Sequence, residues 1–178
     1  MNHRDVVYTI GHSTLPIEVF LESLRNNSVR TLIEVRTIPR SRANPQYNQD
    51  SLKISLEENG IEYVHFPCLG GLRRPRKDSS NIGWKNLSFR GYADYMSTTE
   101  FEKCLQKLIT LLSSGAGEGI VLMCAEALPW RCHRSLIADA LLVRGFDVTH
   151  LMSNKVRRKH NLTSFAVVDG ERIRYPGP

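Results

Sequence analysis

Thiol, imidazole, carboxylate and guanidinium groups are concentrated in one short stretch of the chain. Residues 124–134 include Cys124, Glu126, Cys132, His133 and Arg134. A cysteine becomes a nucleophile when positive charge or the first turn of a helix stabilises its thiolate. We expect Cys132 to lie in such a turn beside arginines. It is therefore a candidate catalytic nucleophile, and Glu126 is placed in the same catalytic group.

A second set of polar side chains follows the first two apolar runs. His12 is a candidate general base or anion donor near neutral pH, so we count it as catalytic. Arg36 needs an anion, because a buried unpaired guanidinium is costly. Its expected partner is Glu126, and a ligand phosphate or carboxylate is the alternative. The candidate ligand-binding residues are Ser13, Arg36, Arg40, Arg42, Tyr92, Cys124, His133 and Arg134.

Each of these side chains also has a purely structural interpretation. Cys124 and Cys132 would then be small core residues, since free cysteine is among the most buried residue types. His12 would bond to the backbone at a turn, and Tyr92 would pack within a short helix. A reversible disulfide between Cys124 and Cys132 is a further interpretation, and it requires Cα atoms within ~7 Å.

Two better-known kinds of site do not match the spacing. In the phosphatase loop, an arginine stands six positions after the cysteine; after Cys124 that position is Trp130, and Arg131 comes one later. No CxxC pair and no HExxH helix is present, so we predict no metal site. The sequence identifies no cofactor.

Five short apolar runs are predicted to be the strands that position these groups. They are residues 6–10, 31–35, 61–66, 119–124 and 147–151. Helical patterns fall between them, including one that opens with a capping box at Thr99–Glu102 and one from Pro129 to Arg144. This alternation predicts parallel strands with helices on both faces. Parallel strands end at one edge of the sheet, so the polar groups are expected to share one site there.

We therefore predict a three-layer α/β fold with a mostly parallel five-stranded sheet and a C-terminal β-hairpin. Residues 165–168 and 172–175 are the two expected hairpin strands, joined at Asp169-Gly170. Residues 1–153 are predicted to form a single α/β domain. Residues 154–178 would be a basic segment and hairpin that pack on that domain or extend it.

Composition excludes several classes of protein. The chain has 178 residues and a net charge of +6, with ordinary apolar content. No apolar run approaches the ~20 residues that span a bilayer, and no signal peptide is recognised, so we expect a cytoplasmic protein without a membrane partner. In that reducing compartment the four cysteines are expected to be free thiols. Oligomeric state is not encoded in any pattern we recognise.

Several short motifs occur in an order that is similar to a known family. They are Tyr8–Ser13, Glu34–Arg36, Leu69–Gly71, Phe89–Met96, Met123–Glu126 and Cys132–Arg134. Together they resemble the family called domain of unknown function 488, although Glu34 stands where that family usually has aspartate. The resemblance implies one α/β domain with these motifs in one site. It implies no reaction.

These observations lead to three hypotheses. The first is that the chain binds, and in an enzyme would modify, a small anionic or nucleotide-like compound through its His, Arg and Cys side chains. The second is a nucleic-acid-binding or nucleic-acid-modifying protein, suggested by the basic stretches 73–90 and 155–159. The third is a thiol redox switch. The residues leave open whether the protein is an enzyme, and they do not identify the substrate.

Overall fold

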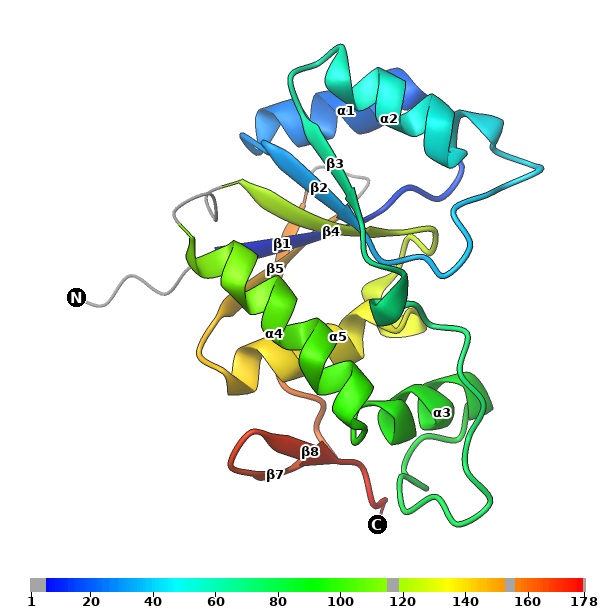
Figure 1. Ribbon diagram of the computed structural model, residues 1–178, viewed down its shortest axis with the longest axis vertical. Coiled ribbons are helices and arrows are strands. Elements are labelled where there is room, and N and C mark those ends of the chain that lie inside the picture. The colour runs from blue at the N-terminus through cyan, green and yellow to red at the C-terminus, as the bar shows by residue number, and fades with distance from the viewer. Residues whose placement is uncertain (1–5, 115–118, 153–155, 178) are drawn as a thin grey trace.

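A computed structural model describes residues 6–114, 119–152 and 156–177 of the chain. Its centre is a six-stranded sheet in the order β3-β2-β4-β1-β5-β6 (Figure 1). The strands are β1 (Val6–Gly11), β2 (Thr31–Glu34), β3 (Glu62–His65), β4 (Ile120–Cys124), β5 (Asp147–Leu151) and β6 (Arg157–Lys159). The first five are parallel and confirm the predicted strands. The sixth is antiparallel to β5 and was not predicted, because its Arg-Arg-Lys sequence is fully exposed and has no apolar residue.

Helices cover both faces of the sheet, as the alternating pattern predicts (Figure 1). On one face lie α1 (Ile17–Asn26) and α2 (Gln49–Glu57), and on the other lie α3 (Leu87–Tyr95), α4 (Thr99–Ser113) and α5 (Arg134–Val143). Successive residues of a strand point to opposite faces. Thus Val121 and Met123 of β4 pack beneath α1 and α2, whereas Leu122 packs in the core formed with α4 and α5.

Two helix starts differ from the sequence-based prediction. The hydroxyl of Thr98, rather than Thr99, caps α4 by accepting a hydrogen bond from the Phe101 amide. Residues Pro129–Arg131 form a short 3₁₀ turn, and α5 begins only at Arg134. The chain is extended at Cys132, with φ −134° and ψ 144°, and this residue separates the 3₁₀ turn from α5. Cys132 therefore lies just before the helix, not within its first turn.

The C-terminal hairpin, β7 (Val167–Asp169) and β8 (Arg172–Arg174), confirms the prediction and forms a separate two-stranded sheet. Its inward residue Ile173 and the following Tyr175 are buried against the core of α3, α4 and α5. No helix in the described ranges is both long and apolar enough to cross a membrane.

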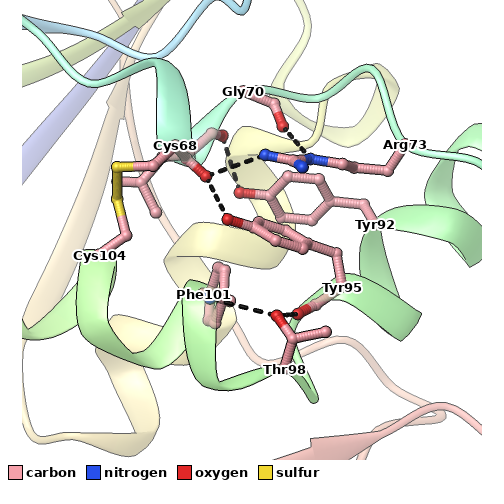
Figure 2. Close-up of a disulfide and its surroundings, with 9 residues drawn as sticks. Cys68, Gly70, Arg73, Tyr92, Tyr95, Thr98, Phe101 and Cys104 are labelled. Carbon is pink, nitrogen blue, oxygen red and sulfur yellow. Dashed lines mark hydrogen bonds between the residues drawn. A yellow bond between two sulfur atoms is a disulfide. The ribbon is translucent and has the colours of Figure 1, made fainter.

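The prediction that all four cysteines are free thiols was wrong. Cys68, in the turn after β3, forms a disulfide with Cys104 of α4, and their Cα atoms are 6.1 Å apart (Figure 2). The two residues are 36 positions apart in sequence, so their proximity arises only when α4 packs beside the turn. Cys124 and Cys132 remain free and buried.

Candidate functional site

The carboxyl ends of β1 and β4 form the crevice in which the predicted polar residues gather. These strands are neighbours, yet the chain leaves β1 for α1 on one face and leaves β4 for α5 on the other. Such a divergence is where open α/β sheets bind ligands. Gly11 allows the two connections to approach closely, because a Cβ there would lie 1.9 Å from the carbonyl oxygen of Glu126.

One pocket at this edge, which we call the thiol pocket, has a volume of about 350 Å³. Cys124, Cys132 and His133 line it together, although β4 contributes the first of them and the segment just before α5 contributes the other two. Other side chains of the lining are apolar, namely Ile38, Leu72 and Phe89. Three more are charged, namely Arg36, Glu126 and Arg131. The pocket therefore combines an apolar wall with nucleophilic and charged groups.

An adjoining pocket, which we call the arginine pocket, has a volume of about 460 Å³. Its lining includes His12, Ser13, Arg40 and Ser41, and it shares Arg36, Ile38, Ala125 and Glu126 with the thiol pocket. Ser13 has a positive φ of 47°, a conformation uncommon outside glycine. The Ser13 amide bonds to the Ala125 carbonyl at 2.8 Å, which ties the connection after β1 to the one after β4.

Arg36 has an internal ion-pair partner, but the partner is Glu34 and not Glu126 as expected. Glu34 is fully buried, and its second carboxylate oxygen accepts a 2.5 Å hydrogen bond from the Tyr63 hydroxyl. The Arg36 guanidinium also donates to the carbonyl of Tyr47. The side chain of Glu126 is exposed and accepts instead from the Leu128 amide, because the connection after β4 turns outward.

His12 is held in one neutral tautomer. Its Nδ1–H donates to the Ser13 carbonyl at 2.8 Å, and its Nε2 accepts from Arg36 at 3.2 Å, since a guanidinium can only donate. Burial lowers the pKa of His12 to about 4, and the nearby Arg36 and Arg134 charges act in the same direction. The ring also stacks on Tyr47, with centroids 4.0 Å apart. Both nitrogens are thus occupied, which favours a role in positioning Arg36.

Arg134 is a buried cation below the thiol pocket, with 1% of its surface exposed. Its guanidinium donates to Cys132 Sγ at 3.4 Å, to Thr9 Oγ1 at 3.2 Å and to the carbonyl of Glu126. Within the described ranges no carboxylate lies at ion-pair distance from it. A buried charge requires a counter-charge, and the sulfur of Cys132 is the group positioned to supply it.

The two free cysteines have opposite pKa shifts. A hydrogen bond from the Cys124 thiol lowers the pKa of Cys132, with further stabilisation from Arg134 and His133. That same hydrogen bond, together with burial, raises the pKa of Cys124. His133 Nδ1 is 3.7 Å from Cys132 Sγ, and its Nε2–H donates to the Val35 carbonyl at 3.0 Å. These opposite directions favour ionisation of Cys132 before Cys124.

A chain of buried hydrogen bonds supports Arg134 from behind, and sequence reasoning missed it. Thr9 Oγ1, which accepts from Arg134, is 2.7 Å from His150 Nδ1. His150 Nε2 is 3.0 Å from His160 Nδ1, and His160 Nε2 is 2.8 Å from Asp139 Oδ1. Burial lowers the pKa of His150 to about 3. A possible signal was the presence of polar residues within otherwise apolar strand and helix patterns, at Thr9 and Asp139.

Two other candidate ligand-binding residues lie away from these pockets. Tyr92 is fully buried, and its hydroxyl donates to the Leu69 carbonyl at 2.8 Å (Figure 2). Its ring lies 5.0 Å from that of His133. Arg42 is exposed in a neighbouring hollow that also includes Arg40. Tyr92 thus packs behind the site, and Arg42 adds positive charge beside it.

Comparison with protein families shows which family the chain is similar to. The family model described as "Domain of unknown function DUF488" matches residues 16–141. That range includes β2, β3, β4 and most of α5, and with them both cysteines of the thiol pocket. No curated protein and no solved structure matches the chain significantly.

Proposed function

This chain belongs to the DUF488 family, which has no assigned reaction, and we propose that it binds a small nucleotide-like anion across the thiol and arginine pockets. The observation that carries this proposal is that the two pockets adjoin, one with an apolar wall and the other with the exposed Arg40 and two serine hydroxyls. A compound with a ring at one end and a phosphate at the other matches this division.

The ring would lie in the thiol pocket. Ile38 and Leu72 leave 59% and 71% of their surfaces exposed, and Phe89 lies beside them. Covering this apolar surface stabilises a complex by roughly 25 cal/mol per Å². The ring would then meet Cys132, His133 and Glu126, the groups that would act on it if the protein modifies its ligand.

The phosphate would lie in the arginine pocket. The Arg40 side chain is exposed and makes no hydrogen bond or ion pair among the described residues, so it is free to bind an anion. Ser13 and Ser41 offer hydroxyl donors beside it. Arginine binds phosphate through two parallel hydrogen bonds, which gives both affinity and orientation.

The test is titration of the purified protein with nucleoside monophosphates and with inorganic phosphate, measured by calorimetry. We expect a nucleotide to bind more tightly than phosphate, and Arg40→Ala to weaken nucleotide binding by about 1.5–3 kcal/mol, or at least roughly tenfold. Phe89→Ala should weaken the binding of the nucleotide and leave the binding of inorganic phosphate unchanged.

Arg30→Ala is the matched control. It removes the same charge next to the start of β2, at the opposite edge of the sheet, and should leave binding unchanged. Equal losses from Arg30→Ala and Arg40→Ala would mean that net charge, and not the arginine pocket, attracts the ligand. Absence of binding by every nucleotide would refute the proposal.

A further inference from the structure

The thiol pocket contains a set of three metal-ligand side chains that no sequence motif predicts. The ligand atoms of Cys124, Cys132 and His133 all lie within 4.8 Å of one another. We propose that these three residues bind a zinc-class divalent ion whose fourth position opens into the thiol pocket. This inference concerns the pocket of the proposed function and rests on it for the ligand that approaches that position.

The separations between the donor atoms are close to those of a tetrahedral site. With Zn–S bonds of about 2.3 Å and Zn–N bonds of about 2.0–2.1 Å, tetrahedral angles place S and N about 3.6 Å apart and two sulfurs about 3.8 Å apart. Cys132 Sγ and His133 Nδ1 are already 3.7 Å apart. Because no two of the three ligand atoms are more than 4.8 Å apart, movements of only about 1 Å would bring all of them to tetrahedral separations.

The groups around the three residues orient them as ligands. His133 donates its Nε2–H to the Val35 carbonyl at 3.0 Å, so Nδ1 is the nitrogen directed at the cysteines. Metal-binding histidines almost always have such a second partner. Gly71 packs against the ring, because a Cβ at that position would lie 2.4 Å from Nδ1. The imidazole is therefore fixed before any ion arrives.

Ligand number and charge indicate an open, reactive type of site. Structural zinc sites have four protein ligands, whereas catalytic ones have three and an exchangeable fourth position. Two thiolates balance a divalent ion, and the buried Arg134, which donates to Cys132 Sγ at 3.4 Å, leaves one positive charge uncompensated. The fourth position thus favours a negatively charged ligand atom, and it faces the pocket to which we assign the ring of the compound.

The probe is Co²⁺, added without oxygen to protein stripped with EDTA and then freed of the chelator. We expect one Co²⁺ per chain, with a thiolate-to-cobalt charge-transfer band in the near ultraviolet and strong visible bands of tetrahedral cobalt, all displaced by Zn²⁺. Cys124→Ser and Cys132→Ser should each remove much of the charge-transfer intensity. His133→Gln, which keeps both thiols, should weaken Zn²⁺ binding by at least about tenfold.

The Cys68→Ser/Cys104→Ser double variant is the control, because it removes both cysteines outside the pocket without leaving a free thiol, and it should retain the charge-transfer band. The metal site would be overturned if no charge-transfer band appears in protein whose Cys124 and Cys132 are shown by alkylation to be free thiols. It would equally be overturned by a band that survives in the Cys124→Ser/Cys132→Ser double variant. A Cys124–Cys132 disulfide that re-forms after mild reduction and prevents metal binding would also overturn it.

Nucleotide titration with EDTA and with Zn²⁺ separates this inference from the proposed function. Nucleotide binding without a cobalt spectrum refutes the metal site alone. A cobalt spectrum without nucleotide binding in either condition refutes the proposed ligand alone.

Discussion

At the scale of single residues, the ion pair between Glu34 and Arg36 supports the wall common to both pockets. Both side chains are buried, with 0% and 6% of their surfaces exposed. Removing one member of a buried pair leaves the other charge uncompensated, which typically costs 3–5 kcal/mol. Aspartate would be a shorter carboxylate of the same charge at position 34. Charge at this position is therefore expected to matter more than length.

We predict that Glu34→Gln lowers the free energy of unfolding by about 3–5 kcal/mol, measured by urea denaturation. Glu34→Asp retains the charge and should cost clearly less. Equal effects of the two substitutions would show that the carboxylate charge does not stabilise Arg36.

His150 should make stability depend on pH. Its pKa is lowered to about 3 by burial, and the charges of His160, Arg134 and Arg158 act in the same direction; Asp139 lies beyond His160. Between pH 6.5 and 3 the unfolded chain binds a proton at this residue and the folded chain does not. The contribution of neutral His150 to the free energy of unfolding is therefore fully present above about pH 6.5. It decreases on acidification, by up to about 1.4 kcal/mol per pH unit.

The measurement is urea denaturation of the wild type and of His150→Gln between pH 7 and 4.5. Because glutamine does not titrate, the stability advantage of the wild type should shrink as the pH falls. A difference that stays constant over this range would contradict the prediction.

At the scale of elements, the disulfide fixes a loop that forms part of the thiol pocket. Cys68 and Cys104 join the turn after β3 to α4, and the same loop continues to Gly71 and Leu72 of the pocket wall. The Arg73 guanidinium stacks on the Tyr95 ring, 3.6 Å from its centroid, and donates to the carbonyls of Cys68 and Gly70 (Figure 2). The pocket wall is thus attached to α3 and α4 from behind.

We predict that Cys104→Ala lowers the unfolding free energy by about 2–4 kcal/mol, since it releases a loop with a sequence separation of 36 residues. The control is chemical reduction, which should destabilise the wild type by a similar amount and leave Cys104→Ala unchanged. If reduction affects both proteins equally, the linkage between Cys68 and Cys104 is not its target.

At the scale of the whole molecule, the C-terminal segment completes the structure around the site. Tyr175 is fully buried; its hydroxyl donates to Asp139 at 2.8 Å, and its amide donates to Asn81 at 2.9 Å. His160, from the same segment, joins Asp139 to the buried chain that reaches Arg134. The segment lies beyond the range matched by the family model, yet it contributes to the support of the thiol pocket.

We predict that Tyr175→Phe costs about 1.5–3 kcal/mol through the hydrogen bond lost at a charged carboxylate. Tyr175→Ala should cost more, about 3–5 kcal/mol, because it also opens a cavity. Both values can be measured by chemical denaturation. Equal costs would mean that the aromatic ring contributes no packing energy.

The sequence by itself determined the layered fold and the edge at which the polar residues meet. Apolar runs of strand length alternate with helical patterns, and this periodicity dictates which face of each element is buried. Because parallel strands end at one edge, the motifs after β1, β2 and β4 had to approach one another. These are local patterns, and each can be read within a dozen residues.

Only the tertiary structure decided which side chains interact. Glu34 rather than Glu126 pairs with Arg36, Cys68 meets Cys104, and Cys124 and Cys132 lie beside His133. Likewise, the buried chain from Arg134 to Asp139 joins residues of four separate segments. The physical reason is that periodicity specifies the direction of a side chain but not its distant neighbour. That neighbour is set by helix packing, by the outward turn after β4 and by the extended backbone at Cys132.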